Sequence, residues 1–392
     1  MRADLALPRL VLVGEVQDAR AYLSDDHSNV STSLVNTFDL LQAHARVGGN
    51  GAAGGPAPEM LLGRFTMELG SGRLIAQEVY RDVTRTFTGI RARWPLPAGA
   101  VVTAFGVLPV LTLPDDRQAL LHNDVVPDGE HVNLKFLGAL YERPRLWLGA
   151  RGEIYLYVLD EHDEPGKRET RNRELWTVGG RLFRNAAIRR WDGELETVWQ
   201  QGFARASSAP TDRRDLRVSA GYVHVHTGYT VEWPWALRLG LEYDYGSGDS
   251  DPADGKWQRF DTLFGNRRTD LGPTSIYGAL GRENVETLGV RLSVAPHARV
   301  DAFAVYRVVR LAAAADGFAS TGVRDATGQS GRNGGQQVDL RWRVWVVPNA
   351  VRLDIGATHL VRGRFLREAP NATGEGDTTY VYGDVTYSFG SQ

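Results

Sequence analysis

Arginine is the residue whose number and spacing in this sequence could do chemistry. Lys and Arg together number 45, and lysine contributes only Lys135, Lys167 and Lys256. The planar guanidinium group binds a carboxylate through two parallel hydrogen bonds, whereas the ammonium group of lysine acts as a point charge. In several segments, arginines and other polar residues alternate with apolar ones, which places them on one face of a β-strand. Ten arginines are expected to form this row: Arg64, Arg91, Arg93, Arg151, Arg181, Arg238, Arg291, Arg341, Arg343 and Arg352.

Acidic side chains occupy the same row and leave two interpretations open. The main ones are Glu242, Asp339 and Asp354, and Glu68, Glu153, Asp244 and Asp384 accompany them. In the first interpretation the arginines pair with these carboxylates across strands and fill a polar interior. In the second, some arginines bind a carboxylate-bearing ligand, and the acidic neighbours keep each site weak enough to release it. We expect pairing for most single arginines, and a few unpaired arginines within the set.

Metal-binding candidates are weaker. His224 and His226 lie on one strand face, as a metal pair would, but no third ligand is evident. Asp249, Asp251 and Asp254 lie in a polar connection, and their spacing does not match the alternate-ligand pattern of an EF-hand. These three are weak candidates for a loose calcium site. We expect no metal and no cofactor.

The elements that must position these side chains are β-strands, because almost every apolar pattern has a period of two. In residues 337–346, for example, Val338 and Leu340 alternate with Asp339 and Arg341. The same alternation occurs in residues 236–245, 286–295, 350–362 and 379–389. Residues 33–47 are the best helix candidate, although they also alternate well enough to form a strand.

The connections between these segments also alternate in length. Turns such as 295–298 and 348–349 are short, whereas 160–173, 247–274 and 313–335 are long and polar. Short turns at one end and long loops at the other are typical of an outer-membrane barrel. We therefore predict an all-β fold with a single transmembrane antiparallel barrel of about 16–18 strands. A soluble β-sandwich or propeller is the alternative, but a propeller repeat of about 40–50 residues is not found.

Composition agrees with an exported membrane protein of one domain, residues 1–392. The sequence has no cysteine, no apolar run long enough for a transmembrane helix, and a formal net charge of −2, which argues against nucleic-acid binding. Its first residues lack the apolar core of a signal peptide. Either the chain is cytoplasmic, or a start methionine has replaced its export signal, and we expect the second.

Enzyme motifs are absent from the sequence. It has no Gly-x-Ser-x-Gly elbow, no His-Glu-x-x-His and no Walker loop. His359 lies on an apolar stripe and suggests an outer-membrane lipase with Ser, His and Asn on a barrel exterior. A single strand histidine near a membrane interface is more often structural, so we expect no enzymatic activity.

Several linked segments carry a resemblance to a known family. They are residues 241–249 (LEYDYGSGD), 254–255, 260–264, 271–273, Asn284, 288–292 (LGVRL), Pro296, 305–307, 311–316, 338–340, 348–349 and 356–365, with 62–65 (LGRF), 72–73 and 85–91 (RTFTGIR) in the first half. In this order and spacing the sequence resembles the alginate export family of outer-membrane barrels. It departs in one respect, since Gly390-Ser-Gln392 follows Phe389 where such barrels commonly end on the aromatic residue.

The resemblance and the arginine row together predict a function. We expect an outer-membrane channel that passes an alginate-like polyuronate, or related anionic solutes, by passive diffusion through an arginine-rich lumen. A general or small-anion porin is one alternative, and a structural or adhesive barrel plugged by its own salt bridges is another. The expected partners are the lipid bilayer and lipopolysaccharide, the anionic cargo and the barrel-assembly machinery. A monomer is the expected state.

Overall fold

The computed structural model describes most of the chain. The described residues are 1–7, 9–50, 56–77, 82–164, 168–266, 268–272, 277–374 and 376–389. Within these ranges the chain forms 19 strands of one antiparallel sheet together with a few short helices. No helix in the described ranges is long and apolar enough to cross a membrane.

The chain divides into two compact units. The first unit comprises Met1–Gly180, Gln200–Val218 and Thr262–Asn266, and the second comprises Arg181–Trp199, Ser219–Asp261 and Arg267–Gln392. The last three residues, Gly390 to Gln392, lie outside the described ranges. The expectation of a single domain stays a prediction.

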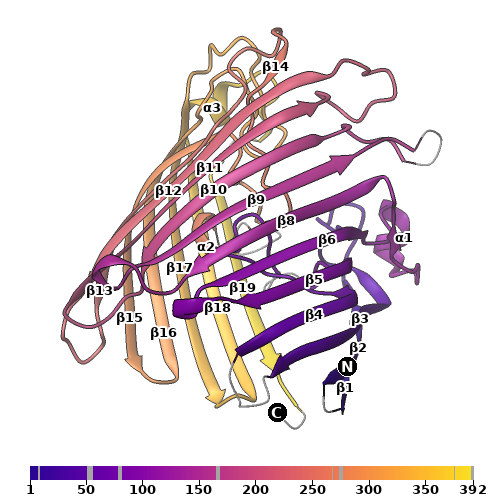
Figure 1. Cartoon of the computed structure of the whole chain (residues 1–392). Coiled ribbons are helices and arrows are strands. Elements are labelled where there is room, and N and C mark those ends of the chain that lie inside the picture. The colour runs from indigo at the N-terminus through magenta and orange to yellow at the C-terminus, as the bar shows by residue number, and fades with distance from the viewer. Residues whose placement is uncertain are drawn as a thin grey trace. The chain divides into compact units, whose positions relative to one another are not determined.

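The first unit is a sheet in which sequence neighbours pair. Its strands are β1 (Arg2–Leu7), β2 (Leu10–Ala19), β3 (Asn36–Asn50), β4 (Pro56–Phe65), β5 (Phe87–Pro95), β6 (Val101–Leu111), β7 (Gly129–Glu130), β8 (Leu134–Arg143) and β9 (Arg151–Glu161), with helix α1 (Arg117–His122). The two-residue β7 pairs with the end of β6, and β8 pairs with the rest of it. Figure 1 shows β4, β5, β6, β8 and β9 side by side. The segment 33–47, left open between helix and strand, is mostly strand β3.

The second unit follows the same rule. Three strands contribute residues to both units: β10 (Glu174–Arg184), β11 (Arg190–Ala204) and β12 (Leu216–Thr230). The second unit contains the strands β13 (Arg238–Gly246), β14 (Lys256–Trp257), β15 (Val285–His297), β16 (Val300–Arg310), β17 (Asn333–Val347), β18 (Val351–Arg362) and β19 (Thr378–Tyr387). It also contains the helices α2 (Arg268–Leu271) and α3 (Arg364–Glu368). Setting aside the two-residue β7 and β14, 17 of the 19 strands of the described chain remain. This number confirms the predicted range of 16–18.

Side chains alternate between two unlike faces of the sheet. In β17, Val338 and Leu340 are exposed at 38% and 48%, whereas Asp339 between them is buried. The register carries this division across strands, because Asp339 stands opposite Val305 of β16 and Thr358 of β18, which are also buried. We call the face of Asp339 the polar face and the face of Leu340 the apolar face. A broad exposed apolar face on a folded protein is a surface that contacts something other than water.

The connections are short at one end of the strands and long at the other. Residues 96–100, 144–150, 298–299 and 348–350 form short turns, and residues 112–133, 162–173, 247–284, 311–332 and 363–377 form long loops. The alternation predicted from the sequence is therefore confirmed. We call the two ends the short-turn end and the long-loop end.

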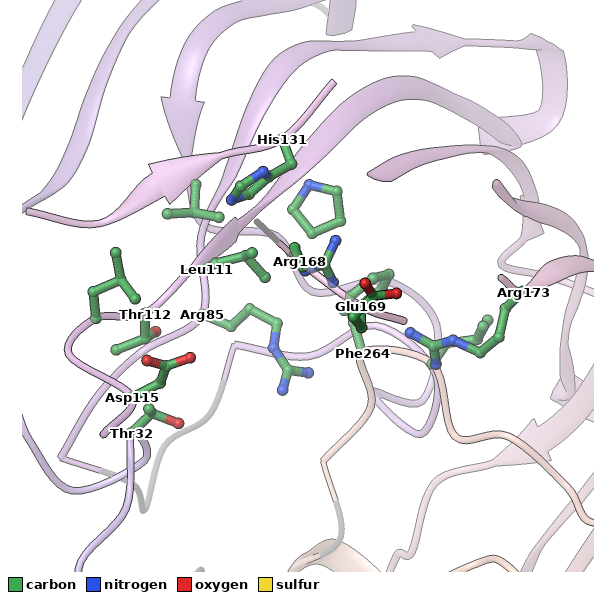
Figure 2. A pocket seen from close by; sticks show the side chains of 14 residues that line it. Thr32, Arg85, Leu111, Thr112, Asp115, His131, Arg168, Glu169, Arg173 and Phe264 are labelled. Carbon is green, nitrogen blue, oxygen red and sulfur yellow. The ribbon is translucent and has the colours of Figure 1, made fainter. Parts of the chain in front are cut away.

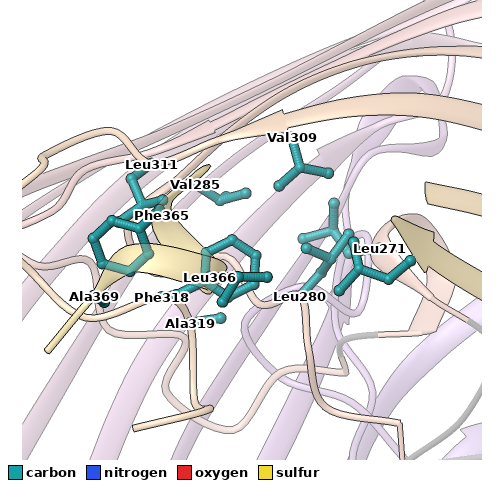
Figure 3. Close-up of a cluster of buried hydrophobic side chains, with 11 residues drawn as sticks. Leu271, Leu280, Val285, Val309, Leu311, Phe318, Ala319, Phe365, Leu366 and Ala369 are labelled. Carbon is teal, nitrogen blue, oxygen red and sulfur yellow. The ribbon is translucent and has the colours of Figure 1, made fainter. Parts of the chain in front are cut away.

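Buried apolar cores lie on the arginine-bearing face, toward the long-loop end. In the first unit the Phe264 ring packs against Phe87 and Phe136, with ring centroids 5.5 and 4.8 Å apart. In the second unit the loops and α3 form an apolar cluster, drawn in Figure 3. Its members are Leu271, Leu280, Val285, Val309, Leu311, Phe318, Ala319, Leu360, Phe365, Leu366 and Ala369. Loops thus fold onto the polar face in both units.

Candidate functional site

Two arginines of the second unit are held by carboxylates of β11. Arg181 donates from Nε and Nη2 to the two oxygens of Glu194, at 2.8 and 2.9 Å. Arg238 donates from Nε and Nη2 to the two oxygens of the buried Asp192, at 2.9 and 2.5 Å. Such two-point pairs between charged groups are the stronger class of hydrogen bond. Both arginines therefore have fixed positions on the polar face.

The middle of the polar face carries a denser network. Arg291 pairs with Glu242 across β15 and β13. Arg307, which the sequence analysis did not single out, is 1% exposed and lies 3.3 Å from Asp339. Thr358 also donates to Asp339, at 2.9 Å. The alternation of β16 does place Arg307 in the row, so this residue was detectable from the sequence.

The strands β17 and β18 hold the next group. Nε and Nη2 of Arg341 lie 3.0 and 2.9 Å from Asp354 Oδ2, and Arg343 lies 2.8 Å from Asp301. Arg352 differs, because its partners are the Thr386 hydroxyl at 3.3 Å and the ring of Trp345 at 5.7 Å. Its guanidinium group has no carboxylate partner among the described residues.

The first unit repeats this mixture of paired and unpaired arginines. Arg91 lies 3.3 Å from Glu59 and 6.0 Å above the Phe65 ring. Arg93, two residues further along β5, is exposed and has no ion pair among the described residues. Arg151 begins β9 and lies in phase with the buried Glu153.

Arg64 does not belong to the row, and this corrects the sequence analysis. Arg64 stands opposite Thr88, whereas Leu61, three residues earlier on β4, stands opposite Arg91, so Arg64 and Arg91 point to opposite faces. Both Leu61 and Leu62 are apolar, so alternation alone did not determine which face was polar. Glu130 at 2.7 Å neutralises Arg64 on the apolar side, near the strand end.

Seven of the ten predicted arginines therefore have carboxylate partners: Arg64, Arg91, Arg181, Arg238, Arg291, Arg341 and Arg343. Among the described residues Arg93 and Arg352 have none, and both lie on the polar face close to the short-turn end of their strands. The arrangement is a polar wall of neutralised pairs, in which the guanidinium groups of Arg93 and Arg352 have no carboxylate partner among the described residues.

His224 and His226, the pair considered as metal ligands in the sequence, have different carboxylate partners in the structure. His224 Nδ1 lies 2.8 Å from Asp244, and ligand atoms of His224, Asp244 and Asp270 all lie within 4.8 Å of one another. His226 instead faces Asp192 at 3.3 Å. Arg282 lies 2.7 Å from Asp270 and supplies positive charge there, so the cluster is a buried ion network.

The loop aspartates are dispersed. The amide of the buried Asp249 donates to Asp316 at 3.0 Å, while Asp251 and Asp254 cap turns of their own loop by accepting from Ala253 and Lys256. In the described ranges the aspartates 249, 251 and 254 do not form a metal-sized group.

The first unit also contains a polar cavity of about 690 Å³ at the long-loop end (Figure 2). Arg85, Arg168 and Arg173 line it together with Phe264, and the Arg85 guanidinium lies 5.5 Å from the Phe264 ring centre. Glu161 accepts from both Arg168 and Arg173 at 3.1 Å. This volume falls in the range of small-molecule sites. The sequence analysis missed these arginines because they flank strands and lie in loops, where side chains have no period.

An antiparallel sheet with an apolar face, a polar face and loops of alternating length defines the class of outer-membrane β-barrel channels. The comparison with known families agrees, since the chain matches the family described as "Alginate export" over residues 4–379. The chain belongs to this family, and it is a β-barrel channel of the bacterial outer membrane.

Solved structures from Pseudomonas aeruginosa have the same fold. OccK9 (OpdG) matches with a TM-score of 0.59 and 11% identity, covering 98% of this chain and 89% of the other. OpdK with vanillate matches at 0.56 and 12%, covering 96% and 92%. OccK2 (OpdF) in complex with glucuronate matches at 0.50 and 11%, covering 89% and 79%. A comparison with curated proteins finds no match.

The barrel fold assigns the two faces and the two ends. In outer-membrane barrels the apolar band contacts lipid and the polar side chains point into the lumen. The short turns lie on the periplasmic side and the long loops on the extracellular side.

Proposed function

We propose that the chain passes an anionic sugar polymer, such as an alginate-like polyuronate, or related anionic solutes by passive diffusion through an arginine-rich lumen. The observation that carries the proposal is the row of arginines on the polar face, in which Arg93 and Arg352 have no carboxylate partner among the described residues. Each sugar of a polyuronate carries one carboxylate, and a free guanidinium group can bind it.

The paired arginines support selection without tight binding. Conduction requires that an ion bind well enough to enter and weakly enough to leave. Carboxylates such as Asp301 and Glu59 already occupy one side of Arg343 and Arg91, so a cargo carboxylate competes with them. The mechanism is electrostatic selection with no chemical step, and we propose no catalytic role for the chain.

Two of the structural neighbours support an anionic cargo. The OpdK structure was solved with vanillate and the OccK2 structure with glucuronate, which are both carboxylates. Glucuronate is also a sugar acid. A monomer acting in the lipid bilayer is the simplest form of the proposed channel.

The test is the reversal potential of single channels in a planar bilayer under a salt gradient, repeated with added oligo-uronates. We expect anion preference and blockade by the sugar acid. The Arg93→Gln and Arg352→Gln double variant should lower both. The control is Arg217→Gln, which removes one positive charge from an exposed position of β12, between the buried Leu216 and Val218. It should leave the anion preference and the blockade unchanged. Anion preference without blockade would instead indicate a porin for small anions.

A plugged structural barrel is the second candidate, because specific contacts favour it. Loop residues are bonded to the polar face of the second unit: the Tyr277 hydroxyl donates to Gln337 at 2.7 Å, and Arg282 is fully buried. Absence of conductance in the bilayer, from a chain shown to be folded, would favour this candidate over the channel.

A further inference from the structure

Three arginines meet at the long-loop end of the second unit. Arg310 ends β16, Arg362 ends β18, and Arg367 lies in helix α3. All three line a groove of about 470 Å³, and Arg362 and Arg367 also line an adjoining hollow of about 390 Å³. None of the three guanidinium groups forms an ion pair with a carboxylate in the described part of the chain. We call these residues the rim cluster.

Two of the guanidinium groups are held in place by backbone atoms. Arg362 Nη1 donates to the carbonyl oxygens of Thr373 and Gly374, at 2.9 and 2.8 Å. Arg367 Nη1 donates to the carbonyl oxygen of Arg362, at 2.6 Å. These contacts position the groups without neutralising them, because carbonyl oxygens carry no net charge. Part of the donor capacity of each guanidinium remains for a ligand.

The groove opens on the apolar face. Val308 and Val361 line it and are exposed at 40% and 41%. Their strand neighbours at buried positions, Val309 and Leu360, point to the opposite side. The side chain of Arg310 is therefore on the surface that contacts lipid, where an unpaired charge near the middle of the membrane would cost about 2–4 kcal/mol. Its place at the strand end avoids that cost and leaves the charge at the level of the headgroups.

Among the described residues, the nearby acidic groups make other contacts. Glu286 stands opposite Arg310 in the sheet register, but its carboxylate accepts from Arg332 Nη2 at 2.8 Å. Asp377 lines the smaller hollow and accepts from the backbone amide of Arg362 at 2.9 Å. Asp377 keeps its charge, because a backbone amide is neutral, but three guanidinium groups surround this one carboxylate, so the rim cluster has a net positive charge beside an apolar surface.

We propose that the rim cluster binds a phosphate group of lipid A, the phosphorylated lipid anchor of lipopolysaccharide in the outer leaflet. The long-loop end lies on the extracellular side. Arginine donates to phosphate through two parallel hydrogen bonds, and basic clusters beside an apolar wall recognise anionic lipid headgroups. The phosphate contacts Arg310 and Arg367, and an acyl chain lies along Val308 and Val361. This site is separate from the polar face and does not rest on the proposed cargo.

The experiment compares two lipids and two variants of the purified full chain in detergent. Binding of bisphosphorylated lipid A and of the same lipid A without phosphates is measured by native mass spectrometry. Arg310→Gln with Arg367→Gln should weaken binding of the phosphorylated lipid roughly 10–30-fold, since each arginine near a charged surface contributes about 1 kcal/mol. Binding of the dephosphorylated lipid should not change.

The matched control is Arg299→Gln, which removes an exposed arginine from the turn between β15 and β16 at the other end of the strands. It should bind phosphorylated lipid A like the parent protein. An equal loss in this control, or an equal loss for the dephosphorylated lipid, would overturn the proposal, as would unchanged binding in the double variant. With the parent protein, raised salt should weaken only the phosphorylated lipid. The single-channel reversal potential of the double variant should stay unchanged, which separates this site from the channel.

Discussion

At the scale of single residues, the polar face shows how buried charges are tolerated. Arg307 and Asp339 are almost fully buried, and the remaining bonding capacity of Asp339 is taken by Gln337 and Thr358. A buried carboxylate left without its cation would cost several kcal/mol. The neutral wall therefore depends on cross-strand partners that no single strand reveals. Arg93 and Arg352 have no such partner among the described residues, and both lie near strand ends, where water can solvate a charge.

Asp249 gives a pH-dependent prediction at the same scale. Burial raises the pKa of Asp249 to about 6, and the neighbouring Asp316 and Asp254 act in the same direction. Because the folded pKa exceeds the usual value near 3.9, the stabilising effect of this group is complete below about pH 4 and is lost as the pH rises through about 6. The loop 247–284 should thus be better ordered at pH 4 than at pH 7.5.

Hydrogen exchange of this loop, corrected for the intrinsic rate, measures the effect. Asp249→Asn should match the parent protein at pH 4 and be better protected at pH 7.5. Asp251→Asn changes an exposed aspartate of the same loop and serves as the control. A parent loop whose protection is independent of pH would contradict the prediction.

At the scale of strands, the period of two decides which side chains meet lipid. Leu340 lies in the middle of β17 on the apolar face, and Gln336 lies on the same face near the long-loop end. Placing a charge on this face is costly in proportion to its depth in the bilayer. A charged substitution on the apolar face should therefore cost more in the middle of a strand than near its ends.

The substitution Leu340→Arg tests this expectation. It should lower the free energy of unfolding in lipid by about 2–4 kcal/mol, whereas Gln336→Arg should cost about 0–1 kcal/mol. Denaturant titration of the barrel in lipid vesicles measures both. Equal costs for the two variants would mean that the apolar face or its depth has been assigned wrongly.

At the scale of the whole molecule, loops pack against the polar face of the second unit. In the second unit, Phe365 and Leu366 of α3 pack with loop and strand residues into the apolar cluster of Figure 3. Phe365 is fully buried there, next to Phe318, with ring centroids 6.4 Å apart. A cluster of this kind ties the loops to the strand ends by burial of apolar surface.

Loosening the cluster should change gating. Phe365→Ala removes a buried aromatic ring, a change that typically costs about 3–5 kcal/mol, and we expect the loops to detach more often. Single-channel recordings should then show more frequent or longer openings, while Phe389→Ala, at an 80% exposed position, should behave like the parent protein. If hydrogen exchange shows loosened loops but the recordings are unchanged, these loops do not obstruct passage.

The sequence by itself determined most of the strands and the alternation of their side chains. Alternation of Val, Leu and Trp with Arg and Asp in β17 and β18 is a local property, because successive side chains of any strand point to opposite sides. The arginine row follows from the same local pattern, whereas the resemblance to the family rests on the order and spacing of short segments along the chain.

Only the tertiary structure decided which charges pair and which faces carry them. The Arg341–Asp354 pair joins two strands, and the neutralisation of Arg64 needs Glu130 from a distant connection. Loop residues such as Arg85 and Arg282 have no period, so their place against the polar face could not be read from spacing. The physical reason is that pairing, burial and loop packing depend on distances between segments far apart in the chain, whereas alternation depends only on neighbours along it.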